Sequence, residues 1–274
     1  ISLINLMPEL PEVETVCNAL KNRAESRIIK EFKIYNPNLR WVINRKIPDK
    51  TANQKINLIK RRGKYIVFHL DNGYLIIHLG MTGIMKLLKM NVSTVKHDHF
   101  DININDKLLL RFNDVRKFGS VHWSESMNQH FLIKNLGPEP LSEDFSSEYL
   151  KEKSKKRKIT IKDLIMNQRI VVGIGNIYAT ESLLLSKIRP NRRCYNLTKK
   201  EYDVLAKSIK RVLKKAIKAG GTSISDFKNL DGGVGYFSQK LKIYGLDECG
   251  ICGEKTYNIS IAGRSSYYCK KCQR

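Results

Sequence analysis

YIVFHLDNGYLIIHL, residues 65–79, places the dipeptide Asn72-Gly73 between two apolar runs that are rich in β-branched and aromatic side chains. Two such runs around an Asn-Gly signal are typical of antiparallel strands joined by a tight turn. Asn105-Asp106 marks a second turn of this kind. Segments of similar composition predict further strands at residues 28–34, 100–104, 107–112 and 120–123. We therefore expect an antiparallel β-sandwich in this half of the chain.

A helix is expected to flank the sandwich. Apolar side chains recur at three- and four-residue spacing in residues 13–24, at Val13, Val16, Cys17 and Leu20. This period is typical of an amphipathic helix with one buried face.

The second half of the chain is predicted to be helical. Residues 136–142 hold two prolines and a glycine, which neither continue a sheet nor begin a long helix, so we place a domain boundary there. Thr198 is an expected N-cap, and Gly220-Gly221 closes the helix that it opens. The predicted helices are 149–154, 161–167, 177–186 and 199–219. A glycine-rich loop at residues 231–235 follows them.

Composition favours nucleic acid as the partner. The chain has 274 residues, 42% of them hydrophobic, and a formal net charge of +24 that is spread along its length. A folded surface with this charge carries a strong positive field. The alternative is a soluble basic protein of another kind, such as a ribosome-associated factor. No apolar run of about 18 residues predicts a membrane span, and residues 1–7 do not resemble a secretion signal, so we expect no membrane partner and a cytoplasmic protein.

Two Cys-x-x-Cys pairs near the C-terminus predict a metal site. Cys249 and Cys252 form one pair, Cys269 and Cys272 form the other, and sixteen residues separate the two pairs. Each pair can hold one side of a tetrahedral ion from a tight turn. Zinc is preferred over an iron–sulfur cluster because the intervening residues favour a β-hairpin. Four thiolate ligands leave no open position, so this zinc ion is expected to be structural.

The N-terminal stretch 7–15, MPELPEVET, is acidic in an otherwise basic chain and reads by itself as a helix start. It also resembles the beginning of the formamidopyrimidine-DNA glycosylase family after loss of the initiator methionine. The resemblance covers residues 7–274. Matching motifs follow in order at residues 62–65, 78–83, 96–99, 114–119, 173–178, 220–222 and 236–237, and in the cysteine module.

The resemblance implies a fold of class α+β with four parts. These are an N-terminal β-sandwich catalytic domain (8–136), a linker (137–145), a helix-two-turn-helix DNA-binding domain (146–240) and a β-hairpin zinc finger (241–274). It also implies a bacterial protein that repairs damaged double-stranded DNA and associates with the nucleoid. We expect a monomer, because the sequence shows neither a coiled coil nor an exposed apolar seam.

The implied activity is removal of oxidised purines from duplex DNA, followed by strand cleavage through β- and δ-elimination. The resemblance assigns the nucleophile to the amine of Pro8 and a general acid to Glu9. It assigns an acid/base and phosphate-binding role to Lys64, and assistance in the second elimination to Arg264. Taken as lone residues, Lys64 and Arg264 would read as solvated surface charges.

Contacts with DNA are implied for seven further residues. A damaged base must leave the stack before its C1′ atom is exposed, and other side chains then fill the gap. The resemblance places Met81, Arg116 and Phe118 in that role. It places His97, Arg157, Lys162 and Asn176 at positions that contact DNA.

Two departures from the family pattern affect these expectations. Residues 1–7 precede Pro8, and an internal proline has an acylated nitrogen that cannot form an iminium. Because Met7 followed by proline suits initiation and methionine removal, we expect translation to begin at Met7. Residues 244–249 are shorter than the family's usual approach to the first cysteine, which leaves the joint to the finger open.

Two alternatives remain open. An enzyme of the endonuclease VIII type would share this architecture but prefer oxidised pyrimidines. The sequence of residues 10–14 and the triplet 116–118 favour the type that acts on purines. A chain that keeps residues 1–7 would be a catalytically silent, lesion-binding protein.

Overall fold

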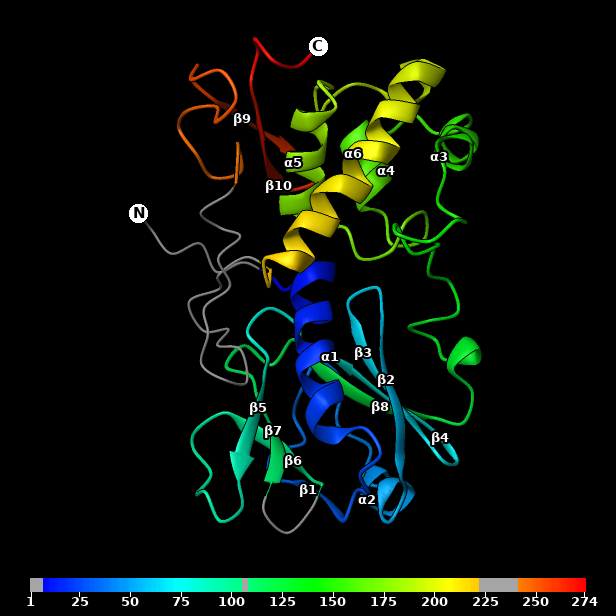
Figure 1. Ribbon diagram of the computed structural model, residues 1–274, viewed down its shortest axis with the longest axis vertical. Coiled ribbons are helices and arrows are strands. Elements are labelled where there is room, and N and C mark those ends of the chain that lie inside the picture. The colour runs from blue at the N-terminus through cyan, green and yellow to red at the C-terminus, as the bar shows by residue number, and fades with distance from the viewer. Residues whose placement is uncertain (1–6, 105–107, 222–240) are drawn as a thin grey trace. The chain divides into compact units, whose positions relative to one another are not determined.

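A computed structural model of the chain describes residues 7–104, 108–221 and 241–274. The described residues divide into two compact units. The first reaches residue 134, and the second begins at residue 135. We describe each unit by itself (Figure 1).

The first unit contains two four-stranded antiparallel sheets. One has the strand order β1-β6-β7-β5 and the other β2-β3-β4-β8. The strands of the first sheet are β1 (Glu31–Ile34), β6 (Asp98–Asn103), β7 (Leu108–Asn113) and β5 (Ile84–Lys89). Those of the second are β2 (Ile56–Arg62), β3 (Tyr65–Leu70), β4 (Gly73–His78) and β8 (Ser120–Ser124). The predicted sandwich is confirmed, although β2 and β5 were not predicted, because lysines and arginines interrupt their apolar residues.

The β3–β4 turn lies one residue earlier than predicted. Leu70 pairs with Gly73, so Asp71 and Asn72 form the loop. Gly73 is needed for close packing, since a Cβ atom there would lie 2.6 Å from the ring of Trp123 on the neighbouring strand β8. The predicted turn at Asn105-Asp106 lies outside the described residues.

One hydrophobic core joins the two sheets and the flanking helix. The rings of Phe32, Phe100 and Phe112 stack across three adjacent strands, with centroids 4.9 and 5.0 Å apart. Helix α1 (Leu10–Ala24) buries the apolar face that its sequence predicted. The short helices α2 (Ile47–Thr51) and η1 (Met127–Gln129) complete this unit.

The second unit is helical and ends in a hairpin. Its helices are α3 (Ser147–Ser154), α4 (Ile161–Met166), α5 (Asn176–Leu185), η2 (Cys194–Asn196) and α6 (Lys199–Lys218). Thr198 caps α6 as predicted, because its side chain accepts the N–H of Glu201 in a reciprocal capping box. Strands β9 (Tyr257–Ile261) and β10 (Arg264–Tyr268) form the hairpin.

The segment 137–145 was predicted as a linker, but its first two residues are hydrogen-bonded to the second unit. The N–H of Gly137 donates to the carbonyl of Gln168 at 2.8 Å, and the N–H of Val172 donates to the carbonyl of Pro138 at 3.1 Å. A Cβ atom on Gly137 would lie 2.5 Å from the backbone of Ile170. Among the helices in the described ranges, none has the length and apolar character needed to cross a bilayer. The glycine-rich loop predicted at 231–235 is not among the described residues.

Candidate active site and metal centre

Pro8 and Glu9 lie directly before the first residue of α1, and both are buried. Glu9 is the N-cap of the helix. Its N–H donates to the carboxylate of Glu12 at 2.9 Å, one half of a capping box that fixes the entry of the chain. The helix start therefore holds the two predicted reactive residues in a defined position, beside the positive end of the helix dipole.

The turn that carries Lys64 is tied to the same helix. Gly63 and Lys64 connect β2 to β3, and Gly63 adopts a left-handed conformation with φ 59°. Arg61 donates to the carbonyl of Gly63 at 3.0 Å and pairs with Glu14 of α1 at 2.7 Å. This ion pair places the Lys64 turn next to the helix that begins after Glu9.

A histidine that sequence reasoning did not select lies near Lys64. Burial, together with smaller contributions from the positive charges of Lys64 and Arg40, lowers the pKa of His78 to about 4. His78 is therefore neutral at physiological pH, and its Nδ1 atom accepts the N–H of Gly80 at 3.0 Å. Its position within the 78–83 motif was the only available sequence signal.

The predicted gap-filling residues come from two turns that pack backbone to backbone. Gly80 has φ +68°, and a Cβ atom there would lie 2.4 Å from the backbone of Phe118 and of Gly119. The turn with Met81 is thereby held against the turn with Arg116 and Phe118. The guanidinium of Arg116 lies over the Phe118 ring, 5.0 Å from its centroid. The structure thus brings together the turns that carry all three residues.

Asp114 joins these two turns and was also missed. Its buried carboxylate accepts the hydroxyl of Thr82 at 2.5 Å, the N–H of Arg116 at 3.2 Å and the N–H of Gly119 at 2.8 Å. An aspartate in a turn usually reads as a solvated residue. Here its carboxylate is the common acceptor that holds the backbone of Arg116 and, through Thr82, the turn that carries Met81.

His97 and Arg157 occupy irregular segments. The carbonyl of His97 accepts the N–H of Asp114 at 3.0 Å, which links its loop to the same junction. Arg157 follows α3 and is exposed; its Nε atom donates to the carbonyl of Lys153 at 2.9 Å.

Lys162, in contrast, is fully buried. Its Nζ atom donates to Asn176 Oδ1 at 2.5 Å, to Ser266 Oγ at 2.7 Å and to the carbonyl of Ser265 at 3.1 Å. The ammonium group thereby connects the start of α5 to the hairpin β9–β10. The DNA contact of Lys162 stays a prediction, and in this structure its Nζ donors face protein oxygens.

Arg264 begins β10 and is exposed at the tip of the hairpin. Ala262 and Gly263 before it adopt left-handed conformations, with φ 48° and 70°. The hairpin is joined to α5 through Glu181, whose carboxylate accepts the N–H groups of Lys242, Ile243 and Tyr244, each at 2.9 Å. The short approach to the first cysteine is therefore anchored on a helix.

The four cysteines converge at the base of this hairpin. Their sulfur atoms all lie within 4.8 Å of one another. Cys249 Sγ is 3.9 Å from Cys272 Sγ, and Cys252 Sγ is 3.6 Å from Cys269 Sγ. A tetrahedral ion with Zn–S bonds of about 2.3 Å needs sulfur separations of about 3.8 Å, so the cluster fits such a metal ion.

Comparison with known proteins gives the same assignment over nearly the whole chain. The family model for the formamidopyrimidine-DNA glycosylase N-terminal domain matches residues 7–121, and that for the H2TH domain matches residues 136–228. The formamidopyrimidine-DNA glycosylase of Legionella pneumophila (strain Paris) is 46% identical over 270 residues, which cover 97% of this chain and 98% of that protein. That of Pasteurella multocida (strain Pm70) is 42% identical, covering 98% and 100%.

The chain belongs to the formamidopyrimidine-DNA glycosylase family. It is therefore an enzyme of the DNA glycosylase class. Solved structures of this family are also similar to it. A Lactococcus lactis Fpg mutant in complex with Fapy-dG-containing DNA has a TM-score of 0.89 and 36% identity, with 97% of this chain and 100% of that chain covered. A complex of L. lactis Fpg with DNA containing an abasic site has a TM-score of 0.89 and 35% identity, covering 97% and 99%.

The family motifs are the source of the predicted site residues. The motifs carry Pro8, Glu9, Lys64, Met81 and Phe118, all in the first unit. Sequence reasoning missed the residues that hold these groups in place, because their partners are distant in the chain.

Proposed function

We propose that this protein excises 8-oxoguanine and formamidopyrimidines from duplex DNA and then cleaves the strand by β,δ-elimination. The observation that carries the proposal is the Pro8-Glu9 pair, which is buried at the start of α1. The names of its relatives support it, as do structural neighbours that hold Fapy-dG or an abasic site.

The chemistry requires a free secondary amine on Pro8. Its lone pair attacks C1′ of the damaged nucleotide, the glycosidic bond breaks, and the base leaves with a proton. Glu9 supplies a proton to the base, or to the sugar ring oxygen as the C1′–O4′ bond breaks and C1′ forms an iminium with the Pro8 nitrogen. The resulting iminium accepts electrons as the C2′ proton is lost and the 3′ phosphate leaves. Loss of a further proton expels the 5′ phosphate, and hydrolysis of the iminium releases the amine.

The remaining residues are proposed to bind and shape the DNA. Lys64 serves as an acid/base group and binds phosphate, and Arg264 assists the second elimination. Met81, Arg116 and Phe118 fill the gap left by the extruded base. His97, Arg157 and Asn176 contact the DNA backbone. We also propose that the cysteine cluster holds one structural zinc ion and that the protein acts as a monomer, with the domain limits given above.

Borohydride trapping tests the nucleophile. We expect a form that begins at Pro8 to give a covalent adduct with an 8-oxoguanine duplex, because borohydride reduces the iminium irreversibly. Peptide mapping should place the adduct on Pro8. The matched control keeps residues 1–7, so its Pro8 nitrogen is an amide, and it should give no adduct. Trapping by this longer form, with its mass verified, would move the nucleophile to a lysine.

Two further comparisons separate the alternatives. Glu9→Gln keeps the amine but removes the proton donor, so base excision should fall much more than cleavage of a preformed abasic site. A duplex with an oxidised pyrimidine tests the substrate class. Faster excision from that duplex than from the 8-oxoguanine duplex would favour an endonuclease VIII-type enzyme.

A further inference from the structure

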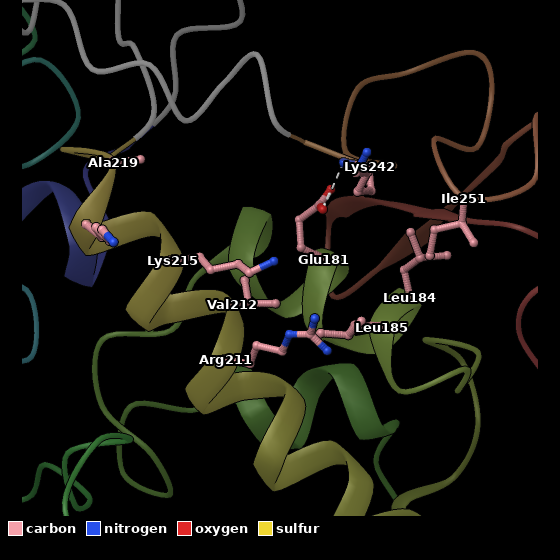
Figure 2. Close-up of a pocket in the computed structure, with 10 residues that line it drawn as sticks. Glu181, Leu184, Leu185, Arg211, Val212, Lys215, Ala219, Lys242 and Ile251 are labelled. Atoms are coloured by element: carbon pink, nitrogen blue, oxygen red, sulfur yellow. Dashed lines mark hydrogen bonds between the residues drawn. The ribbon is translucent and has the colours of Figure 1, made fainter.

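The second unit contains a pocket that the proposed chemistry does not use. It has a volume of about 760 Å³ and lies between the later half of α5, the C-terminal half of α6 and the approach to the cysteine cluster (Figure 2). A volume of this size is typical of sites that bind small molecules or peptide side chains.

The base of the pocket is apolar. Leu184 and Val212 are buried there, and Leu185 adds a partly exposed side chain. Ile251 on the rim is 54% exposed. Its aliphatic side chain has no role in metal binding, so the cysteine cluster does not account for this exposed apolar group. An apolar side chain of a ligand would be removed from water here, which favours binding by about 25 cal/mol per Å² of apolar surface buried.

The rim of the pocket is strongly basic. Arg211, Lys215 and Lys218 project from α6, and Lys242 lies on the opposite side; all four are exposed. Among the described residues that line the pocket, Glu181 is the acidic one, and its carboxylate accepts backbone N–H groups, one of them from Lys242 (Figure 2). Burial also raises the pKa of Glu181. The rim cations are thus available to an anion from outside.

The charge continues along α6. This helix has eight basic and two acidic residues. Lys200, Lys207, Arg211, Lys214 and Lys218 are exposed at spacings of seven, four, three and four residues, which places them on one helical face. A ligand in the pocket could therefore extend acidic residues along this face.

We propose that the pocket binds an acidic peptide segment of a partner protein, with one apolar side chain of that segment inserted between α5 and α6. The combination of a basic rim and an apolar base favours a peptide over DNA, because a phosphate backbone has no apolar group to place in the base. The pocket residues Leu184 and Leu185 lie eight and nine residues after Asn176, about 12 Å further along the α5 axis. The proposed DNA contact of Asn176 is thus at the other end of the helix.

Fluorescence anisotropy at 150 mM salt tests the proposal with a fluorescein-labelled peptide, Ser-Asp-Glu-Asp-Leu-Phe-Asp-Glu-Asp. Its comparison peptide replaces Leu-Phe by Gly-Ser and keeps the charge. We expect binding of the first peptide and at least about tenfold weaker binding of the second, because the second cannot fill the apolar base. Ile251→Ser should weaken binding of the Leu-Phe peptide only.

Charge reversal provides the matched pair of variants. Arg211→Glu/Lys215→Glu should weaken peptide binding about tenfold or more. Arg45→Glu/Lys46→Glu makes the same change in net charge at two exposed residues of the first unit that do not line the pocket, so it should change binding about twofold or less. Both variants should bind an 8-oxoguanine duplex equally. Absence of peptide binding, equal binding of both peptides, or equal effects of both variants would overturn the proposal. So would a selective loss of duplex binding in Arg211→Glu/Lys215→Glu, which would assign the pocket to DNA.

Discussion

Lys162 on α4 donates a 2.5 Å hydrogen bond to the side chain of Asn176 at the start of α5, and the same ammonium group bonds Ser265 and Ser266 of the hairpin that carries Arg264. Asn176 is held from its other side as well, because its amide donates to the hydroxyl of Tyr244 at 3.2 Å. One buried cation therefore sets the relative position of Asn176, a proposed DNA contact, and of the hairpin with Arg264, the residue proposed to assist the second elimination.

The first prediction concerns Lys162→Met. Methionine fills a similar volume but leaves three oxygen atoms without this donor, one of them the buried Ser266 Oγ, which should lower the free energy of unfolding by about 1–3 kcal/mol. Duplex binding should weaken because Asn176 and Arg264 lose their shared support. The dependence of log Kd on log salt should keep its slope, since no phosphate contact is lost. A slope reduced by about 0.9 would instead show direct contact with a phosphate.

Arg157 should behave in the opposite way. It is exposed, so Arg157→Ala should leave stability nearly unchanged. We expect weaker binding to damaged and undamaged duplexes alike and a salt slope that falls by about 0.9, because one counterion fewer is released. Titrations at several salt concentrations measure this. An altered preference among lesions, with the slope unchanged, would contradict the phosphate role.

The contrast between Lys162 and Arg157 shows what the sequence can reveal. Local signals predicted β3, the cap at Thr198 and the cysteine pairs, because the determining residues lie within a few positions of each other. Family motifs supplied Pro8 and Glu9. The partners of Lys162 lie up to 104 residues away, and no local pattern indicates that this lysine is buried.

The same reasoning applies to Asp114 and to strand β2. Asp114 fixes the Met81 turn through Thr82, 32 residues earlier, so its role becomes visible only in the folded sheet. In β2, the run Lys60-Arg61-Arg62 reads as a solvated segment. Arg61 is nevertheless partly buried by its ion pair with Glu14, 47 residues away.

Asp114→Asn should separate lesion extrusion from strand cleavage. The amide keeps the size of the carboxylate but turns an NH₂ group toward donors, which loosens the junction between the Met81 and Phe118 turns. We predict that 8-oxoguanine excision slows about tenfold or more, since small displacements of positioned groups are costly. Cleavage of a preformed abasic site should change less. Val115→Ala, an exposed neighbour, is the control, and equal losses on both substrates would argue against this positioning role.

Metal removal should affect the hairpin and DNA binding together. We expect one zinc ion per chain by native mass spectrometry, because four thiolates fit one tetrahedral ion. A strong chelator or Cys272→Ala should remove the zinc ion, reduce duplex affinity and expose the hairpin to proteolysis. Cys17→Ala is the matched control, because burial raises the pKa of that thiol to about 12 and it lies in the other unit. A protein without metal that keeps its duplex affinity and protease resistance would refute this expectation.

The last prediction uses the buried histidines of the first unit as a pH probe. Burial lowers the pKa of His122 to about 4, with a smaller contribution from the positive charge of His130, whose own pKa is also lowered by burial. An unfolded histidine titrates near pH 6.5. Between pH 6.5 and 4 the unfolded chain therefore binds a proton at His122 that the folded chain does not. Stability must fall as the pH drops through this window and be independent of this group above it.

His122→Gln isolates that contribution. The ring of His122 packs on Trp41 and Phe131, with centroids 5.4 and 5.5 Å apart, so the variant should melt at a lower temperature than the wild type at pH 7.5. Glutamine does not titrate, and all other groups are shared by the two proteins. The drop in Tm between pH 7.5 and pH 4.5 should therefore be smaller in His122→Gln, by roughly 2–4 °C. Differential scanning calorimetry at the two pH values measures the drop in Tm of each protein. Equal drops would mean that the pKa of His122 is the same in the folded and the unfolded chain.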